Sequence, residues 1–246
     1  MESFRQAATI ADQRIAGISG LGRATAYGMR SIPWLQRLRA LTAKHGILLV
    51  LDEIQAGVGR TGTFFAFEAA GIVPDIVTVS KAISAYGLPM AIVLLKPKDD
   101  IWKPAAHSGT FRGDNLAFVT AKAALEHYWA DDTFLKEIAH KSQILQAKLE
   151  GLVSDFPQLE LKSRGRGLIY GLVSATDKSF ARRVARLAFE RDMVIETCGP
   201  NGEVLKFLTA LNIDDLELER GLSILRDSIA SLDASQVVEK GGVLSV

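Results

Sequence analysis

The chain has 246 residues and is nearly neutral, with 29 Lys and Arg against 28 Asp and Glu. This balance argues against a nucleic-acid-binding protein, which usually carries a basic stripe, and a composition of 48% hydrophobic residues is typical of a globular chain. The single cysteine, Cys198, excludes an intrachain disulfide and suits a reducing compartment. No apolar run approaches the roughly 18 residues that a membrane-spanning helix requires, so we expect a cytoplasmic protein without membrane or nucleic-acid partners.

The first 32 residues are rich in Arg, Ala and Gly and lack apolar periodicity, so we expect them to form a poorly structured leader. A helix is predicted from Pro33 to just before Gly46, with proline in the first turn and glycine past the end. Residues 47–51 are continuously apolar, which favours a central parallel strand. Two further strands are predicted at 75–80 and 91–95.

In the second half, helices are predicted at 115–129, with Asp114 as the N-cap, and at 133–153. Beyond Pro157, strands alternating with helices are predicted at 159–162, 168–173, 194–197 and 204–208. A last helix starts near Asp214 with an apolar stripe, and the tail after Asp233 is expected to fray. The order of elements predicts an α/β domain followed, from about residue 155, by a smaller α+β domain.

Two charged residues, Asp52 and Lys81, each follow a predicted parallel strand, where open α/β sheets bind their ligands. A salt bridge, or a helix cap formed by Asp52, would explain them without any ligand. A pyridoxal phosphate (PLP) site would also explain them. That cofactor requires a lysine to form a Schiff base and a carboxylate to keep its ring nitrogen protonated.

The loop Gly57–Gly62 matches the G-x-G-x-x-G pattern of dinucleotide-binding proteins. That fingerprint requires an acidic residue about 20 residues on, near the end of the next strand. Asp75 lies near that distance but at the start of the strand, which disfavours a nicotinamide-dependent oxidoreductase. The sequence has no G-x-S-x-G elbow, and its four histidines lack metal-ligand spacing, so neither a hydrolase of that type nor a metal site is expected.

Two segments resemble those of a known family. Residues 51–62 are similar to the D-E-[VI]-Q-x-G-x-G-R-T-G signature of class III aminotransferases, and residues 74–81 resemble the P-D-[IL]-x-x-x-[SA]-K segment that carries the family's PLP lysine. The separation of Asp52 and Lys81 along the chain also matches. The resemblance implies PLP as cofactor and the fold of the PLP-dependent transferases (fold type I), with an incomplete large domain here.

The resemblance also implies roles for individual residues. Lys81 would bond to the cofactor and then move a proton during the reaction, and Asp52 would pair with the pyridine nitrogen. Gln55 would hydrogen-bond the ring hydroxyl, and Ile54 would pack on the ring face. Thr110 would reach the cofactor phosphate of a neighbouring subunit, which implies a homodimer.

A branch of the family from ectoine synthesis is similar at several further stretches, namely 86–89, 102–104, 109–113, 117–121 and 127–129. This finer resemblance implies transfer of a terminal amino group, as in L-2,4-diaminobutyrate, to 2-oxoglutarate. Relatives that act on ornithine, 4-aminobutyrate or other ω-amino groups share the core motifs and remain an alternative.

The resemblance is expected to run from Pro33 to about residue 232. It predicts a leader at 1–32, the C-terminal part of the PLP-binding large domain at 33–154, a small domain at 155–233 and a tail at 234–246. The family's upstream segments are missing, so an inactive fragment is an alternative. Lys206 stands where many relatives have an arginine that grips a substrate carboxylate, although lysine lacks the planar fork of arginine.

Overall fold

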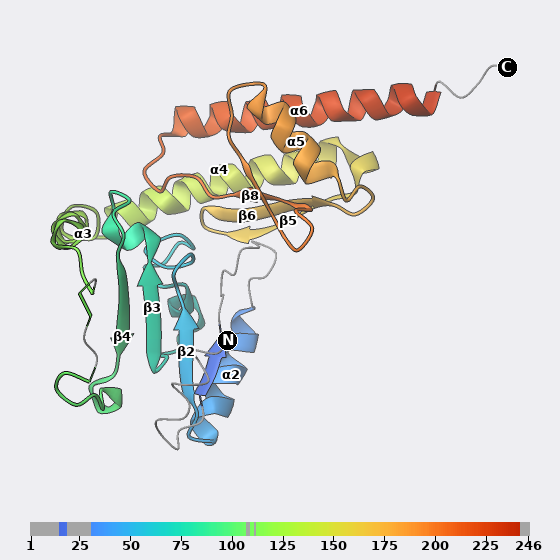
Figure 1. Ribbon diagram of the computed structural model, residues 1–246. Helices are drawn as coiled ribbons and strands as arrows, with labels where there is room; N and C mark the ends of the chain where they lie inside the picture. Colours follow the sequence, from blue (N-terminus) through green and yellow to red (C-terminus); the bar gives the residue numbers. More distant parts are fainter. Residues whose placement is uncertain (1–14, 19–30, 107–108, 111, 242–246) are drawn as a thin grey trace. The chain divides into compact units, whose positions relative to one another are not determined.

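The computed structural model describes residues 15–18, 31–106, 109–110 and 112–241, although the side chains of residues 15–18 and 233–241 are not described. Most of the predicted leader and the last residues of the tail lie outside these ranges. The chain divides into two compact units (Figure 1). Among the described residues, unit 1 extends to Leu135 and unit 2 begins at Lys136.

Unit 1 contains a sheet with the strand order β1-β2-β3-β4, formed by Ile15–Ile18, Leu48–Asp52, Ile76–Ser80 and Ala91–Leu95. Strands β2 and β3 are parallel, as the sequence predicts. Strand β1 pairs in parallel with β2, so the expectation of a poorly structured leader is wrong for these four residues. Four residues are too few to show a periodic pattern, and the pairing of Ile15 with Leu48 identifies the strand only in the folded chain.

The last strand of this sheet runs the other way, because β4 pairs with β3 in antiparallel register. The connection between them holds only the short 3-10 helix η3, Lys81–Ser84. A parallel neighbour requires a crossover connection of a dozen or more residues, usually through a helix, so a short link favours the antiparallel arrangement.

Helices and short turns complete unit 1. Helix α2 spans Ile32–Lys44, and the 3-10 helices η2 and η4 span Ala66–Ala70 and Pro97–Asp99. Helix α3, Asn115–Tyr128, is capped as predicted, since the Asp114 side chain accepts a hydrogen bond from Leu116 N at 2.8 Å. Two apolar clusters form the core, and one of them unites Val58 in the glycine-rich loop with Val77, Val79 and Ile83.

Unit 2 is built on an antiparallel sheet with the order β5-β6-β8-β7, formed by Leu161–Arg166, Ile169–Ser174, Val204–Phe207 and Glu196–Cys198. Strands β5 and β6 form one hairpin, closed by Gly167 at φ +62°, and β7 and β8 form another. The predicted alternation of strands with helices therefore holds only where α5, Phe180–Phe189, separates β6 from β7. The strands of a hairpin are joined by a turn of a few residues. Such a short turn is not visible in the pattern of apolar residues, so the pattern does not predict which strands form hairpins.

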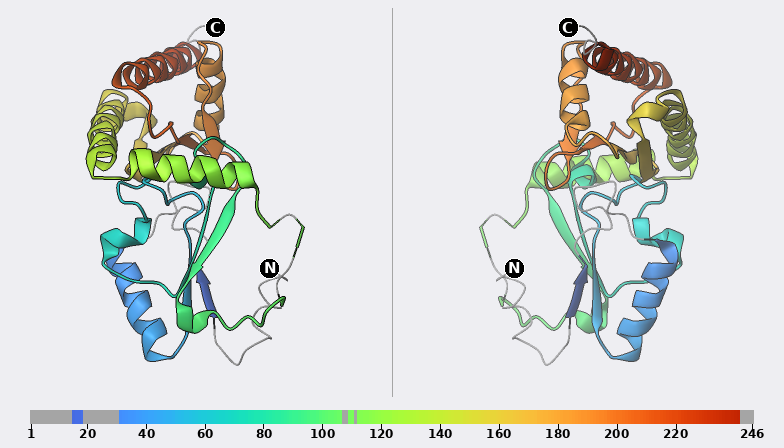
Figure 2. Two further views of the ribbon diagram at one scale, coloured as in Figure 1. Left: turned by 90° about the vertical axis from the view of Figure 1, so that its left-hand side faces the viewer. Right: turned by 90° about the vertical axis from the view of Figure 1, so that its right-hand side faces the viewer.

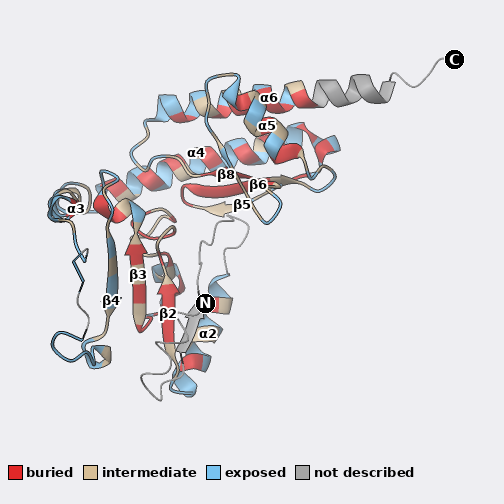
Figure 3. Cartoon of the chain, viewed as in Figure 1, coloured by how far each residue is buried: buried red, intermediate tan, exposed pale blue. Residues whose placement is uncertain are grey.

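Three helices cover one face of this sheet (Figures 1 and 2): α4 at Thr133–Asp155, which begins at the end of unit 1, then α5, and α6 at Asp215–Gly241. The 3-10 helix η5, Pro157–Leu159, leads into β5. The predicted stripe of α6 is buried (Figure 3), at Leu218, Leu222, Leu225, Ile229 and Leu232. Helix α6 continues to Gly241, so the expectation that the chain frays directly after Asp233 is wrong. In the described part of the chain, no helix combines the length and apolar character needed to cross a bilayer.

Candidate cofactor site

The parallel strands β2 and β3 of unit 1 end at the same edge of the sheet (Figure 1), which brings Asp52 and Lys81 to that edge. Asp52 is the last residue of β2 and is in register with Thr78 of the parallel strand β3, while Lys81 directly follows the end of β3. The ladder continues one residue past β2, because Glu53 N donates to Thr78 O at 2.9 Å. A carboxylate and an amine therefore follow neighbouring strands at their carboxyl ends, where open α/β sheets bind ligands.

The Asp52 carboxylate is half-buried and oriented by its own turn. Its Oδ1 atom accepts a hydrogen bond from Ile54 N at 2.9 Å, a local Asx turn. Within the described ranges the other carboxylate oxygen has no hydrogen-bond partner. It is therefore available to accept a proton-bearing nitrogen of a ligand.

Lys81 has an unusual backbone conformation. Its φ is +57°, in the left-handed region that residues with a Cβ rarely adopt, and Ala85 shortly after it has φ +63°. Strained backbone of this kind often marks a functional position. The side chain is exposed, and among the described residues its ammonium has no ion-pair partner. Beside it, Ser80 Oγ donates to Met90 O at 2.6 Å and fixes the strand end.

The glycine-rich loop after Asp52 folds back on itself. Gly59 N donates to Phe64 O at 3.2 Å and Gly62 N donates to Gly59 O at 2.9 Å. A dinucleotide-binding loop continues directly into an α-helix. Here the loop is followed instead by the short 3-10 helix η2. Burial lowers the pKa of Arg60 to about 10, so this guanidinium remains charged at neutral pH.

Asp75, the acidic residue considered for a nicotinamide site, has a structural role in unit 1. It is 6% exposed and accepts hydrogen bonds from Leu49 N at 2.9 Å, Arg39 Nη1 at 2.7 Å and Lys96 Nζ at 2.6 Å. Burial raises the pKa of Asp75, but these donors outweigh it and lower the pKa to about 2. Asp75 thus links α2, β2 and β4 and is not positioned to hold a ribose, which further disfavours that alternative.

The structure gives the location and exposure of the other predicted site residues, Ile54, Gln55, Thr110 and Lys206. Ile54 and Gln55 are half-buried in the turn next to Asp52, and their contacts with the cofactor stay predictions. Thr110 is exposed in a turn before α3, and its predicted contact with a neighbouring subunit stays a prediction. In unit 2, Lys206 is 7% exposed, and its Nζ atom lies 3.0 Å from Glu196 Oε2 on the adjacent strand. Its carboxylate-binding role also stays a prediction.

Sequence reasoning missed Glu53, whose side chain is completely buried. Its carboxylate accepts hydrogen bonds from the backbone N–H groups of Ala66 and Phe67, at 3.0 and 3.2 Å. A signal was available, because an acidic residue at the end of an apolar strand and a glycine four positions later occur within one motif. The motif directs attention to Asp52, and the side chain next to it was assigned no role.

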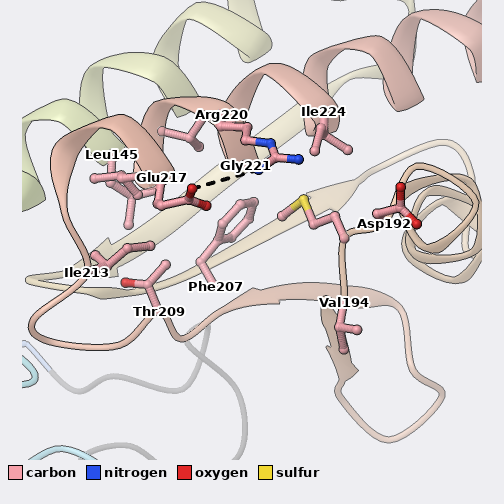
Figure 4. A pocket seen from close by; sticks show the side chains of 13 residues that line it. Leu145, Asp192, Val194, Phe207, Thr209, Ile213, Glu217, Arg220, Gly221 and Ile224 are labelled. Carbon is pink, nitrogen blue, oxygen red and sulfur yellow. Dashed lines mark ion pairs between the residues drawn. The ribbon is translucent and has the colours of Figure 1, made fainter.

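Each unit also has an open cavity. In unit 1, a cavity of about 570 Å³ next to the end of β3 includes Ser80, Met90, Arg112 and Phe118. In unit 2, a cavity of about 350 Å³ is bordered by α4, α6 and β8 (Figure 4). The second is mainly apolar, has a Glu217–Arg220 ion pair in its wall and contains none of the predicted site residues.

Solved structures identify the class of protein that this arrangement defines. An N-acetylornithine aminotransferase from Stenotrophomonas maltophilia superposes with a TM-score of 0.77 and 32% identity, covering 95% of this chain and 61% of that structure. An S-selective transaminase from Arthrobacter sp. superposes with a TM-score of 0.79 at 19% identity, over 90% of this chain and 52% of that one, which shows the fold alone. The fold is that of the PLP-dependent transferases of fold type I.

The sequence profile of class III aminotransferases matches residues 23–229, and the chain belongs to this family, whose cofactor is PLP. A diaminobutyrate–2-oxoglutarate transaminase from Bordetella parapertussis is 49% identical over 240 residues, 96% of this chain and 54% of that protein. One from Vibrio cholerae is 52% identical over 193 residues, covering 78% of this chain and 46% of that one. The profile match begins at residue 23 and the Bordetella alignment covers 96% of the chain, so the expected start of the resemblance at Pro33 is wrong.

The chain spans about half the length of the curated relatives that it matches. What those relatives do as whole proteins therefore bears on this chain only as a proposal.

Proposed function

We propose that this chain holds PLP through Asp52 and Lys81, and that it acts in the transfer of a terminal amino group from L-2,4-diaminobutyrate to 2-oxoglutarate. The observation that carries the proposal is the parallel register of β2 and β3, which brings a half-buried carboxylate and an exposed lysine to one sheet edge. The family match supports the cofactor, and the names of relatives at about half identity support the substrates.

The residues of the site fit the cofactor chemically. The unshared oxygen of Asp52 can accept a hydrogen bond from the protonated pyridine nitrogen, and the partly buried position of the carboxylate strengthens that contact. When bound, PLP supplies an electron sink for the carbanion that amino transfer requires. The Lys81 amine can bond to the cofactor aldehyde and can carry a proton, because it is exposed and has no ion-pair partner in the described chain.

Two further parts of the proposal concern neighbours of the site. Ile54 and Gln55 contact the ring from the turn after β2, where both are half-buried. Thr110 contacts the phosphate held by a second copy of the chain in a homodimer. Large apolar side chains exposed on α3 support such a partner, since an exposed apolar patch commonly marks an interface: Leu116, Phe118, Val119 and Leu125.

An amino-transfer assay tests this function. The chain is loaded with PLP and supplied with 2-oxoglutarate and one amino donor, and glutamate formation is measured. Glutamate formed with L-2,4-diaminobutyrate, and abolished in Lys81→Ala, is the expected result. Preference for ornithine or 4-aminobutyrate would contradict the proposed donor, and absence of glutamate with every donor would indicate an inactive fragment.

A further inference from the structure

Glu53 is a fully buried carboxylate beside the residue proposed to hold the pyridine nitrogen. It is 0% exposed, and hydrogen bonds from Ala66 N and Phe67 N at the start of η2 satisfy its oxygens. An unpaired buried carboxylate is costly, so the loss of these donors would destabilise Glu53 in its buried position. The position of η2 and the position of Glu53 therefore depend on each other.

The backbone of Glu53 is held as well. Its N–H donates to Thr78 O of β3 and its C=O accepts from Gly57 N, both at 2.9 Å. At Gly57, an added Cβ would lie 2.9 Å from Glu53 O and 3.3 Å from Glu53 Oε2, so a side chain there would displace Glu53. Glu53 is thus hydrogen-bonded to β3, to Gly57 in the turn that follows β2, and to η2.

Consecutive side chains of an extended segment point to opposite faces of a sheet. Because the ladder to β3 includes Glu53, its side chain enters the core while that of Asp52 faces the other way. Glu53 does not contact a ligand held by Asp52, and any effect on that ligand acts through Asp52. We propose that Glu53 is a positioning residue, which fixes the turn at 52–57 to β3 and η2 and so sets where the Asp52 carboxylate lies relative to Lys81. This inference rests on the proposed function.

Two substitutions disturb Glu53 in different ways, and a third is a matched control. Glu53→Gln keeps the shape but replaces one acceptor oxygen by an NH₂ donor that would face a backbone N–H. Gly57→Ala leaves Glu53 chemically intact and pushes against it. The control is Glu68→Gln, because Glu68 also accepts a backbone N–H at η2, from Phe65 at 3.3 Å, but is exposed.

Each PLP-loaded variant is titrated with pH while the absorbance of the cofactor bound at Lys81 is recorded, and the Kd for PLP is measured. Asp52 controls the protonation of the pyridine nitrogen, so its displacement shifts the titration midpoint, which a purely structural role of Glu53 would not do. We expect a shifted midpoint and a Kd raised roughly tenfold in Glu53→Gln and Gly57→Ala. We expect neither change in Glu68→Gln. Wild-type midpoints and Kd values in both test variants would overturn the proposal.

A measurement on the wild-type chain keeps the proposal testable if both variants fail to fold. Hydrogen exchange at the amides of Gly57, Ala66 and Phe67 is followed with and without PLP. If Glu53 couples these amides to Asp52, PLP slows their exchange, and unchanged rates would overturn the proposal. The proposed function is refuted by a different result, namely a wild-type chain that forms no PLP adduct at Lys81. If the adduct forms normally but Glu53→Gln and Gly57→Ala have wild-type midpoints and Kd values, only the role of Glu53 is refuted.

Discussion

Replacing Asp75 by asparagine tests the account of unit 1 quantitatively. The Asp75 carboxylate accepts hydrogen bonds from a backbone N–H of β2, from Arg39 of α2 and from Lys96 after β4. Asparagine keeps the shape but removes the charge and offers one acceptor oxygen in place of two. Arg39 and Lys96, which are 19% and 35% exposed, would lose their charged partner.

The size of the effect follows from the pKa of Asp75, which falls from 3.8 to about 2. Such a shift corresponds to about 2.5 kcal/mol between the two protonation states. Solvent screens part of the Lys96 interaction, so we expect Asp75→Asn to lower the free energy of unfolding by about 2 kcal/mol at neutral pH. Because the pKa is depressed in the folded state, this stabilisation is present above about pH 4 and is lost as the pH falls toward 2.

Urea unfolding at a series of pH values measures this difference. Tryptophan fluorescence reports on unit 1, which contains all three tryptophans, Trp34, Trp102 and Trp129. Asp100→Asn is a suitable control, because Asp100 is exposed and no ion pair in the described chain involves it. A difference between wild type and Asp75→Asn that stays constant from pH 7 to pH 2 would refute the reasoning.

Substitutions at three further positions test packing and helix formation, each by the free energy of unfolding. Gly151→Ala should stabilise α4 by about 0.5–1 kcal/mol, since no atom lies within 4 Å of an added Cβ, and a loss of stability would contradict this. Leu225→Ala should cost about 2–5 kcal/mol, because Leu225 of α6 is 0% exposed; a cost below 1 kcal/mol would mean that this stripe is not core. Asp114→Ala should cost about 1 kcal/mol through the lost α3 N-cap, and Asp114→Ser should recover most of it.

The sequence predicts those elements of the fold that have strong local patterns. Strands β2 and β3 and helix α3 lie where apolar runs and an N-cap residue indicate them. Strand β1 and the hairpins of unit 2 were not foreseen, because they depend on pairing with distant residues rather than on local periodicity. The polar composition after Asp233 favours a frayed tail, but a polar composition does not by itself stop a helix, and α6 continues to Gly241.

In the candidate site, too, residues within a local pattern could be predicted, whereas contacts between distant residues could not. Asp52 and Lys81 could be identified because each follows a predicted parallel strand and lies in a motif that resembles those of a known family. The partners of Glu53 and Asp75 could not, since their donors lie between 13 and 36 residues away along the chain. Burial of an acidic side chain is decided by such distant donors, which no single segment contains.

Under the proposed function, Lys81 bonds to PLP at the edge of the unit 1 sheet. Reduction of the PLP-treated chain with borohydride, followed by mass spectrometry of its peptides, tests this most directly. We predict a stable pyridoxyl group on Lys81, lost in Lys81→Ala and weakened in Asp52→Asn. Pyridoxyl groups found on many surface lysines, with no preference for Lys81 and no dependence on Asp52, would contradict the proposal that Lys81 bonds to PLP.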